Sequence, residues 1–148
     1  MVTRHVPRDF VEFLKSLISE KVEYLVVGGY AVGYYGHPRV TDDLDLWIAM
    51  SARNADRIMN ALEEFGFSQT GASKDLFLSK NQIIRMGVPP VRIELLTSID
   101  GVDFDECYAR REVGQLGGLT VDFISLSHLK QNKRASGRPK DLDDLTHL

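Results

Sequence analysis

The sequence predicts an α+β domain in which helices flank a mixed β-sheet. Segments of helical periodicity alternate irregularly with short β-branched runs, in the order helix, strand, helix, strand, helix, several strands and two helices. The chain has 148 residues, the size of one domain, and 43% of them are hydrophobic, so a packed core is expected. We therefore predict a single domain over residues 1–148, with a core at about 22–124 and closing helices at about 125–148.

The first half supplies two strands that border or contain chemistry-bearing residues. Apolar residues recur at helical spacing over 8–20, and a β-branched run over 22–27 then ends at a glycine pair. A short helix is expected over 30–35. Residues 43–48 alternate between polar and apolar side chains, which is the period of a strand.

The second half is less regular. Ser51 is a plausible N-cap for a helix that runs to Phe65 and ends at Gly66. The remaining expectations are weak strands at 75–79 and 82–86, a strand at 91–97, a short helix at 104–110, a turn or loop at 114–118, a strand at 119–124, and helices at 127–135 and 139–147.

Composition excludes several classes of function. The net charge of −3 and the pI of about 5.8 disfavour a general nucleic-acid coat protein. The apolar runs are too short to span a bilayer, and residues 1–10 lack the apolar centre of a secretory signal. The single cysteine, Cys107, fits a reducing compartment, so we expect a cytoplasmic protein.

The most informative stretch runs from Val27 to Ile48. Gly28 and Gly29 follow a strand and precede a helix, where backbone N–H groups favour phosphate. Asp43 and Asp45 share one strand face, and two such carboxylates favour a divalent cation between them. Either pair alone is more often an ordinary turn or a solvated strand face, but together they predict phosphoryl-type transfer.

This stretch resembles the nucleotidyltransferase superfamily that includes DNA polymerase β, kanamycin nucleotidyltransferase and the small minimal nucleotidyltransferases. The resemblance implies Mg²⁺ (or Mn²⁺) on Asp43 and Asp45, an NTP whose triphosphate lies at Gly28 and Gly29, and a third carboxylate on a later strand. Glu94 fits that position, as metal ligand and base, although the superfamily more often has Asp there. A glutamate on an edge strand, paired with Arg85 or Arg92, is the alternative. Arg39 faces the nucleotide or pairs with Asp42.

The C-terminal tail is basic. Lys133 and Arg138 are the preferred phosphate ligands among five cations at positions 130–140, where no acid occurs, although a solvated helix surface is the ordinary explanation. The tail also resembles the K-x-A-x-G-R-x-K-D-x-x-D pattern of the AbiEii-like nucleotidyltransferases, a group that includes toxins of toxin–antitoxin systems. Its residues here are Lys133, Ala135, Gly137, Arg138, Lys140, Asp141 and Asp144.

The predicted function is Mg²⁺-dependent transfer of a nucleoside monophosphate from an NTP to an acceptor hydroxyl. The acceptor stays open between RNA such as a tRNA end, a protein and an aminoglycoside-like molecule. It binds across a shallow groove, against a second subunit of a homodimer, or through an antitoxin or other regulator. The alternative is a catalytically weak nucleotide-binding regulatory module, and a purely structural domain is a third reading. The four histidines show no metal-ligand spacing.

Overall fold

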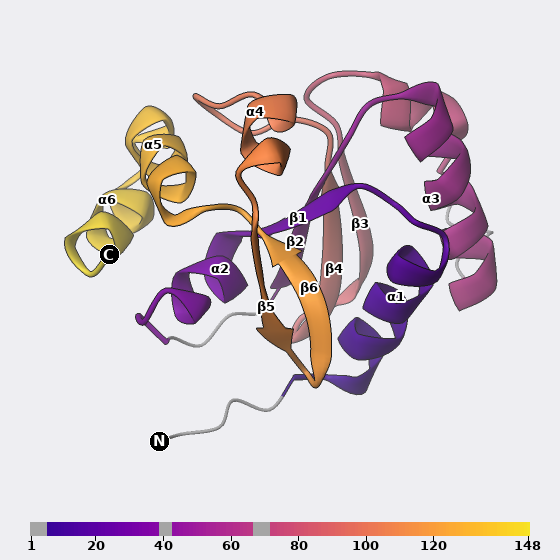
Figure 1. Cartoon of the computed structure of the whole chain (residues 1–148), viewed down its shortest axis with the longest axis horizontal. Coiled ribbons are helices and arrows are strands. Elements are labelled where there is room, and N and C mark those ends of the chain that lie inside the picture. Colours follow the sequence, from indigo (N-terminus) through magenta and orange to yellow (C-terminus); the bar gives the residue numbers. More distant parts are fainter. Residues whose placement is uncertain (1–5, 39–42, 67–71) are drawn as a thin grey trace.

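A six-stranded sheet forms the centre of the molecule (Figure 1), and the computed structural model describes residues 6–38, 43–66 and 72–148. The strand order is β3-β4-β2-β1-β6-β5. β2 pairs with β4 and β1 with β6 in parallel, and the other neighbours are antiparallel, so the predicted mixed α+β fold is confirmed. The strands are β1 (Tyr24–Val27), β2 (Asp43–Ile48), β3 (Ile83–Val88), β4 (Val91–Leu96), β5 (Glu112–Leu116) and β6 (Leu119–Phe123).

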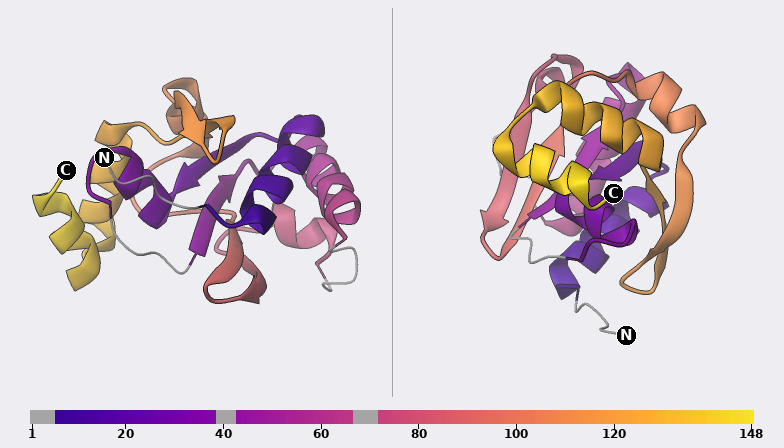
Figure 2. Two further views of the ribbon diagram at one scale, coloured as in Figure 1. Left: turned by 90° about the horizontal axis from the view of Figure 1, so that it is seen from below. Right: turned by 90° about the vertical axis from the view of Figure 1, so that its left-hand side faces the viewer.

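Apart from α4, the helices lie in two groups around this sheet (Figure 1). α1 and α3 lie side by side against one face, whereas α2, α5 and α6 gather at one end of the sheet (Figures 1 and 2). The second group contains the two closing helices that the sequence predicts. The bounds are α1 (Arg8–Ser19), α2 (Gly28–Tyr34), α3 (Ala52–Phe65), α4 (Phe104–Ala109), α5 (Leu126–Ser136) and α6 (Pro139–Thr146).

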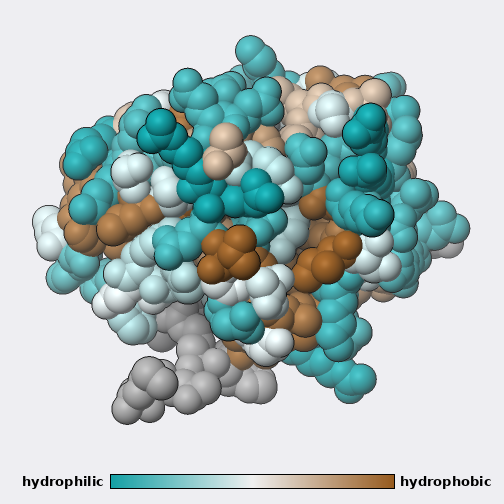
Figure 3. Space-filling view, viewed as in Figure 1, coloured by the Kyte–Doolittle hydropathy of each residue, from teal (hydrophilic) through white to brown (hydrophobic). Residues whose placement is uncertain are grey.

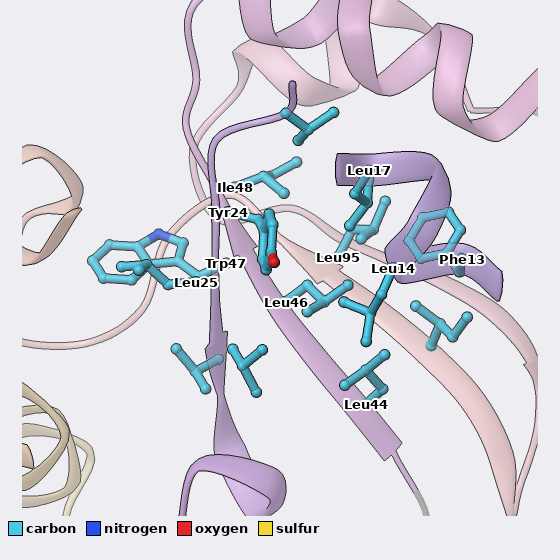
Figure 4. Packing of buried hydrophobic residues seen from close by; sticks show 14 of the residues in the cluster. Phe13, Leu14, Leu17, Tyr24, Leu25, Leu44, Leu46, Trp47, Ile48 and Leu95 are labelled. Carbon is cyan, nitrogen blue, oxygen red and sulfur yellow. The ribbon is translucent and has the colours of Figure 1, made fainter. Parts of the chain in front are cut away.

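The alternation of β2 separates the core from the polar face. Leu44 and Leu46 point to the side of α1, where they meet its apolar residues, while Trp47 lies on the opposite side of the strand (Figure 4). The Trp47 ring packs edge-to-face on Phe104 of α4, with ring centroids 5.1 Å apart. Side chains two residues apart share a strand face, so the polar residues that precede Trp47 face away from the α1 core.

Two sequence-based expectations were wrong. The segment predicted as a strand at 75–79 is a 3₁₀ helix, Lys74–Leu78, which buries Phe77, and the Ser79 hydroxyl donates to the Asp75 carbonyl. The segment predicted as a loop at 114–118 is mostly strand β5. Its hairpin turn to β6 consists of Gly117 and Gly118, both with positive φ, the conformation that favours a tight two-residue turn.

The surface seen in Figure 3 is largely hydrophilic, with hydrophobic side chains in separate patches. No helix in the described part of the chain is both long and apolar enough to cross a membrane.

Candidate active site

The sheet brings three carboxylates together on its polar face. Asp45 of β2 lies directly opposite Glu94 on the parallel strand β4, and Asp43 is two residues away on the same face as Asp45. One carboxylate oxygen from each of the three residues lies within 4.8 Å of the others. The three carboxylates predicted on separate parts of the sequence therefore meet at one place.

Asp45 is partly buried between the other two carboxylates. Burial, followed by repulsion from Glu94 and Asp43 and partly offset by Lys140, raises the pKa of Asp45 to about 7. Its Oδ1 atom is buried and accepts no hydrogen bond from any residue that the structure describes. A divalent cation would offset the repulsion between the carboxylates and would give the Asp45 Oδ1 atom a partner. The cluster therefore fits a metal of the Mg²⁺ type.

Two arginines neutralise the outer carboxylates. Arg92 Nη2 lies 2.7 Å from Asp43 Oδ2, and Arg85 Nε lies 3.2 Å from Glu94 Oε1. Glu94 therefore has features of both sequence-based interpretations: it lies beside the two aspartates, as a metal ligand would, and it pairs with an arginine. It does not lie on an edge strand, however, because β4 is flanked by β3 and β2.

Gly28 forms the floor of the cluster. Its φ is +66°, and a Cβ atom at this position would overlap the carboxylate of Asp45. Val27, the residue before it, lies opposite Asp45 across the β1–β2 pairing. Glycine is therefore required both by the backbone conformation and by the space, whereas Gly29 is buried inside α2 and does not line the cavity.

A cavity of about 490 Å³ opens above this floor. Carboxylates from the sheet line one side, and cationic and polar groups of α5, α6 and their connection line the other. A ligand with both a bound cation and anionic groups complements such a divided wall. The charged lining residues are Asp43, Asp45, Arg85, Glu94, Asp100, Lys133, Arg138, Lys140 and Asp141.

The basic wall is held by a buried ion-pair network. Lys133 is 4% exposed, and its Nζ lies 2.9 Å from Asp141 Oδ1 and 3.1 Å from Asp144 Oδ2. Arg138, with a side chain 74% exposed, donates from Nε to Asp141 Oδ2 at 2.8 Å, and the Ser136 hydroxyl also donates there. Burial opposes ionisation, but these hydrogen bonds together lower the pKa of Asp141 to about 2.

Comparison with known proteins agrees with this arrangement. The family described as aminoglycoside-2''-adenylyltransferase matches residues 9–148. The chain belongs to this family. It is accordingly a nucleotidyltransferase enzyme, as the sequence predicts, while the AbiEii-like grouping stays a prediction.

The fold of this nucleotidyltransferase also occurs in a solved structure. A protein from Thermotoga maritima, described as a candidate nucleotidyltransferase, shares 18% identity with a TM-score of 0.59, over 97% of this chain and 95% of that one. No protein of curated function matches the sequence at a significant level.

Some residues of the nucleotidyltransferase site escaped the sequence analysis. Asp144 was noted only as part of a motif, yet it is 1% exposed and shares the Lys133 ammonium with Asp141. The available signal was the spacing of Asp141 and Asp144, which are three residues apart and therefore on one face of a helix, with Lys133 on the preceding helix. Arg39 and Asp42 lie outside the described residues.

Proposed function

We propose that this nucleotidyltransferase moves a nucleoside monophosphate from an NTP to an acceptor hydroxyl with the help of Mg²⁺ or Mn²⁺ at Asp43, Asp45 and Glu94. The observation that carries the proposal is the convergence of the three carboxylates beside the Gly28 backbone. The raised pKa of Asp45 means that its ionised form is unfavourable beside the other two carboxylates. A bound cation would make the ionised form favourable. The family to which the chain belongs supports the same chemistry.

The reaction forms one bond and breaks one. The acceptor oxygen attacks the α-phosphorus, the bond from that phosphorus to the bridging oxygen breaks, and pyrophosphate leaves. The metal supplies charge neutralisation of the phosphates. Glu94 takes the proton of the acceptor hydroxyl. Gly28, which lines the cavity, lets the Asp45 carboxylate lie directly against the backbone.

The cationic wall acts on the opposite side of the phosphates. Arg138 is exposed, aimed by its hydrogen bond to Asp141, and free to reach an anion with the rest of its guanidinium. Lys133 lines the same cavity, but its ammonium is held between two buried aspartates. We therefore assign direct phosphate binding to Arg138 first, and to Lys133 a weaker contact through the field of its charge.

We take an aminoglycoside-type polyol as the first acceptor to test, because the matching family carries that description. The test incubates the protein with α-labelled NTPs, Mg²⁺ and a panel of aminoglycosides, with RNA and protein acceptors in parallel. Label transfer that falls roughly 100-fold or more in Asp43→Asn and Asp45→Asn supports the proposal. Asp75→Asn, an exposed aspartate on the 3₁₀ helix, is the matched control and keeps full activity.

A catalytically weak regulatory module is the second candidate. The short ion pair between Arg92 and Asp43 favours it, because this arginine already neutralises a carboxylate that the metal needs. Calorimetry separates the two candidates: binding of ATP with Mg²⁺ but no labelled product with any acceptor supports the module. A toxin–antitoxin role, for which only the tail motif argues, predicts label transfer to tRNA or protein instead of to aminoglycosides.

A further inference from the structure

Two histidines and an aspartate meet outside the cavity. His37 follows α2, while Asp143 and His147 lie one turn apart at the end of α6, on the same helical face. The rings of His37 and His147 are stacked, with centroids 3.9 Å apart and an angle of 5° between the planes. His147 Nε2 lies 4.0 Å from Asp143 Oδ1, and one ligand atom from each residue lies within 4.8 Å of the others.

The donor set has a clear chemical preference. Imidazole nitrogens suit Zn²⁺ and neighbouring first-row ions, whereas Mg²⁺ prefers oxygen ligands alone. Two imidazoles and one carboxylate, with an open fourth position, are a common zinc set, with ligand bonds of about 2.0–2.2 Å. Side chains at the surface can rotate to close on such an ion, since His147 and Asp143 are 46% and 72% exposed.

The position of the cluster gives such an ion a structural consequence. α2 begins at Gly28, which forms the floor of the cavity, and α6 begins directly after Arg138, which lines its cationic wall. α6 and α2 lie close together at this end of the sheet (Figures 1 and 2). None of the three ligand candidates lines the cavity itself, so the cluster is separate from the carboxylate site.

We propose that His37, Asp143 and His147 form a second metal site, selective for Zn²⁺-like ions over Mg²⁺, which fastens α6 to the end of α2. The ion holds the cationic wall of the cavity at a fixed distance from the floor. This role is independent of nucleotide transfer, and binding at this site can be measured without any substrate.

The test uses the full chain without an affinity tag, because a polyhistidine tag would bind the same ions. Asp43→Asn/Asp45→Asn serves as the background, with excess Mg²⁺, so that the carboxylate cluster does not compete for the probe. Co²⁺ is the spectroscopic probe and Zn²⁺ its competitor. His37→Gln and His147→Gln remove one ligand each, and His128→Gln, on α5 beside Ser125, is the matched control.

The expected result is one equivalent of Co²⁺ displaced by Zn²⁺, with affinity at least about tenfold weaker in His37→Gln and His147→Gln and unchanged in His128→Gln. Zn²⁺ should also raise the thermal midpoint of the background protein and not that of the two variants. Equal binding in all proteins, or no binding of either ion, overturns the proposal and leaves the stacked rings as a packing contact. Asp143→Asn, which keeps both rings, guards against variants that disturb folding.

Discussion

The carboxylate of Asp45 fills the space that a Cβ atom on Gly28 would occupy. Asp45 lies on β2, and Gly28 is the first residue of α2, directly after Val27, the last residue of β1, which is paired with Asp45. A side chain at position 28 cannot be added without moving the carboxylate that the proposed metal site depends on. The position of the Asp45 carboxylate therefore depends on glycine at position 28.

Gly28→Ala is expected to lose both stability and activity. The new methyl group displaces Asp45. The positive φ of residue 28 adds backbone strain of about 1–2 kcal/mol once the residue is not glycine. Gly36→Ala is the matched control, because Gly36 also has a positive φ but has nothing within 4 Å of the added Cβ. Urea unfolding and the transfer assay together separate strain, which both variants share, from displacement, which only Gly28→Ala shows. Equal activity in the two variants would contradict this account.

The metal-free protein should become less stable as the pH rises toward neutrality. The pKa of Asp45 is raised to about 7, so the folded state holds this proton more tightly than the unfolded chain does. The resulting stability is complete below about pH 4 and is lost as the pH rises through 7.

Asp45→Asn removes this dependence. In EDTA it should gain roughly 4 kcal/mol over the wild type between pH 4 and pH 8, measured by urea unfolding. Mg²⁺ should restore the wild type and leave the variant unchanged. Asp75→Asn serves as the control, and a wild type with the same pH profile as Asp45→Asn would argue against the buried acid.

Lys133 and Arg138 should separate stability from activity. Lys133→Met removes the buried cation that Asp141 and Asp144 share and should cost about 3–5 kcal/mol of unfolding free energy. Lys130→Gln, on the same helix, should change stability by less than about 0.5 kcal/mol. Arg138→Gln should leave stability nearly unchanged and lower kcat/KM for the NTP. If Arg138→Gln proves the more destabilising variant, the assignment of the two cations is reversed.

Glu94 can be tested by charge and by length. Glu94→Gln removes the negative charge and should abolish the response of activity to Mg²⁺, while Glu94→Asp keeps the charge and should retain a reduced response. Titration of activity with Mg²⁺ and with Mn²⁺ measures both. Glu112→Gln, on β5 away from the cavity, is the control. Full activity of Glu94→Gln would remove it from the proposed mechanism.

The fold could be predicted because its signals are local. The alternation in β2, the N-cap at Ser51 and the glycine at 66 each depend on a few adjacent residues, and the structure confirms them. The errors arose where a local pattern was too short to decide. Five residues at 75–79 fit strand or helix equally, and burial of Phe77 against α3 settles the matter only in three dimensions.

The site shows the same limit at longer range. The aspartates could be placed on one face from sequence alone, but the pairing of Glu94 with Asp45 depends on the parallel register of β2 and β4. Histidines at positions 37 and 147 show no ligand spacing in sequence because separate elements carry them. Strand register and helix packing are tertiary properties that no short window contains.

The alternation of β2 also protects the site during folding. A shift of its pairing by one residue would turn Asp43 and Asp45 into the apolar layer beneath α1 and expose Leu44 and Leu46 to water. Such a misaligned chain would bury two charges without partners and lose its core, so it would not persist as a folded protein. The strand register that buries Leu44 and Leu46 is the same register that places Asp43 and Asp45 on the polar face. Formation of the core therefore selects the chain alignment in which the carboxylates reach the cavity.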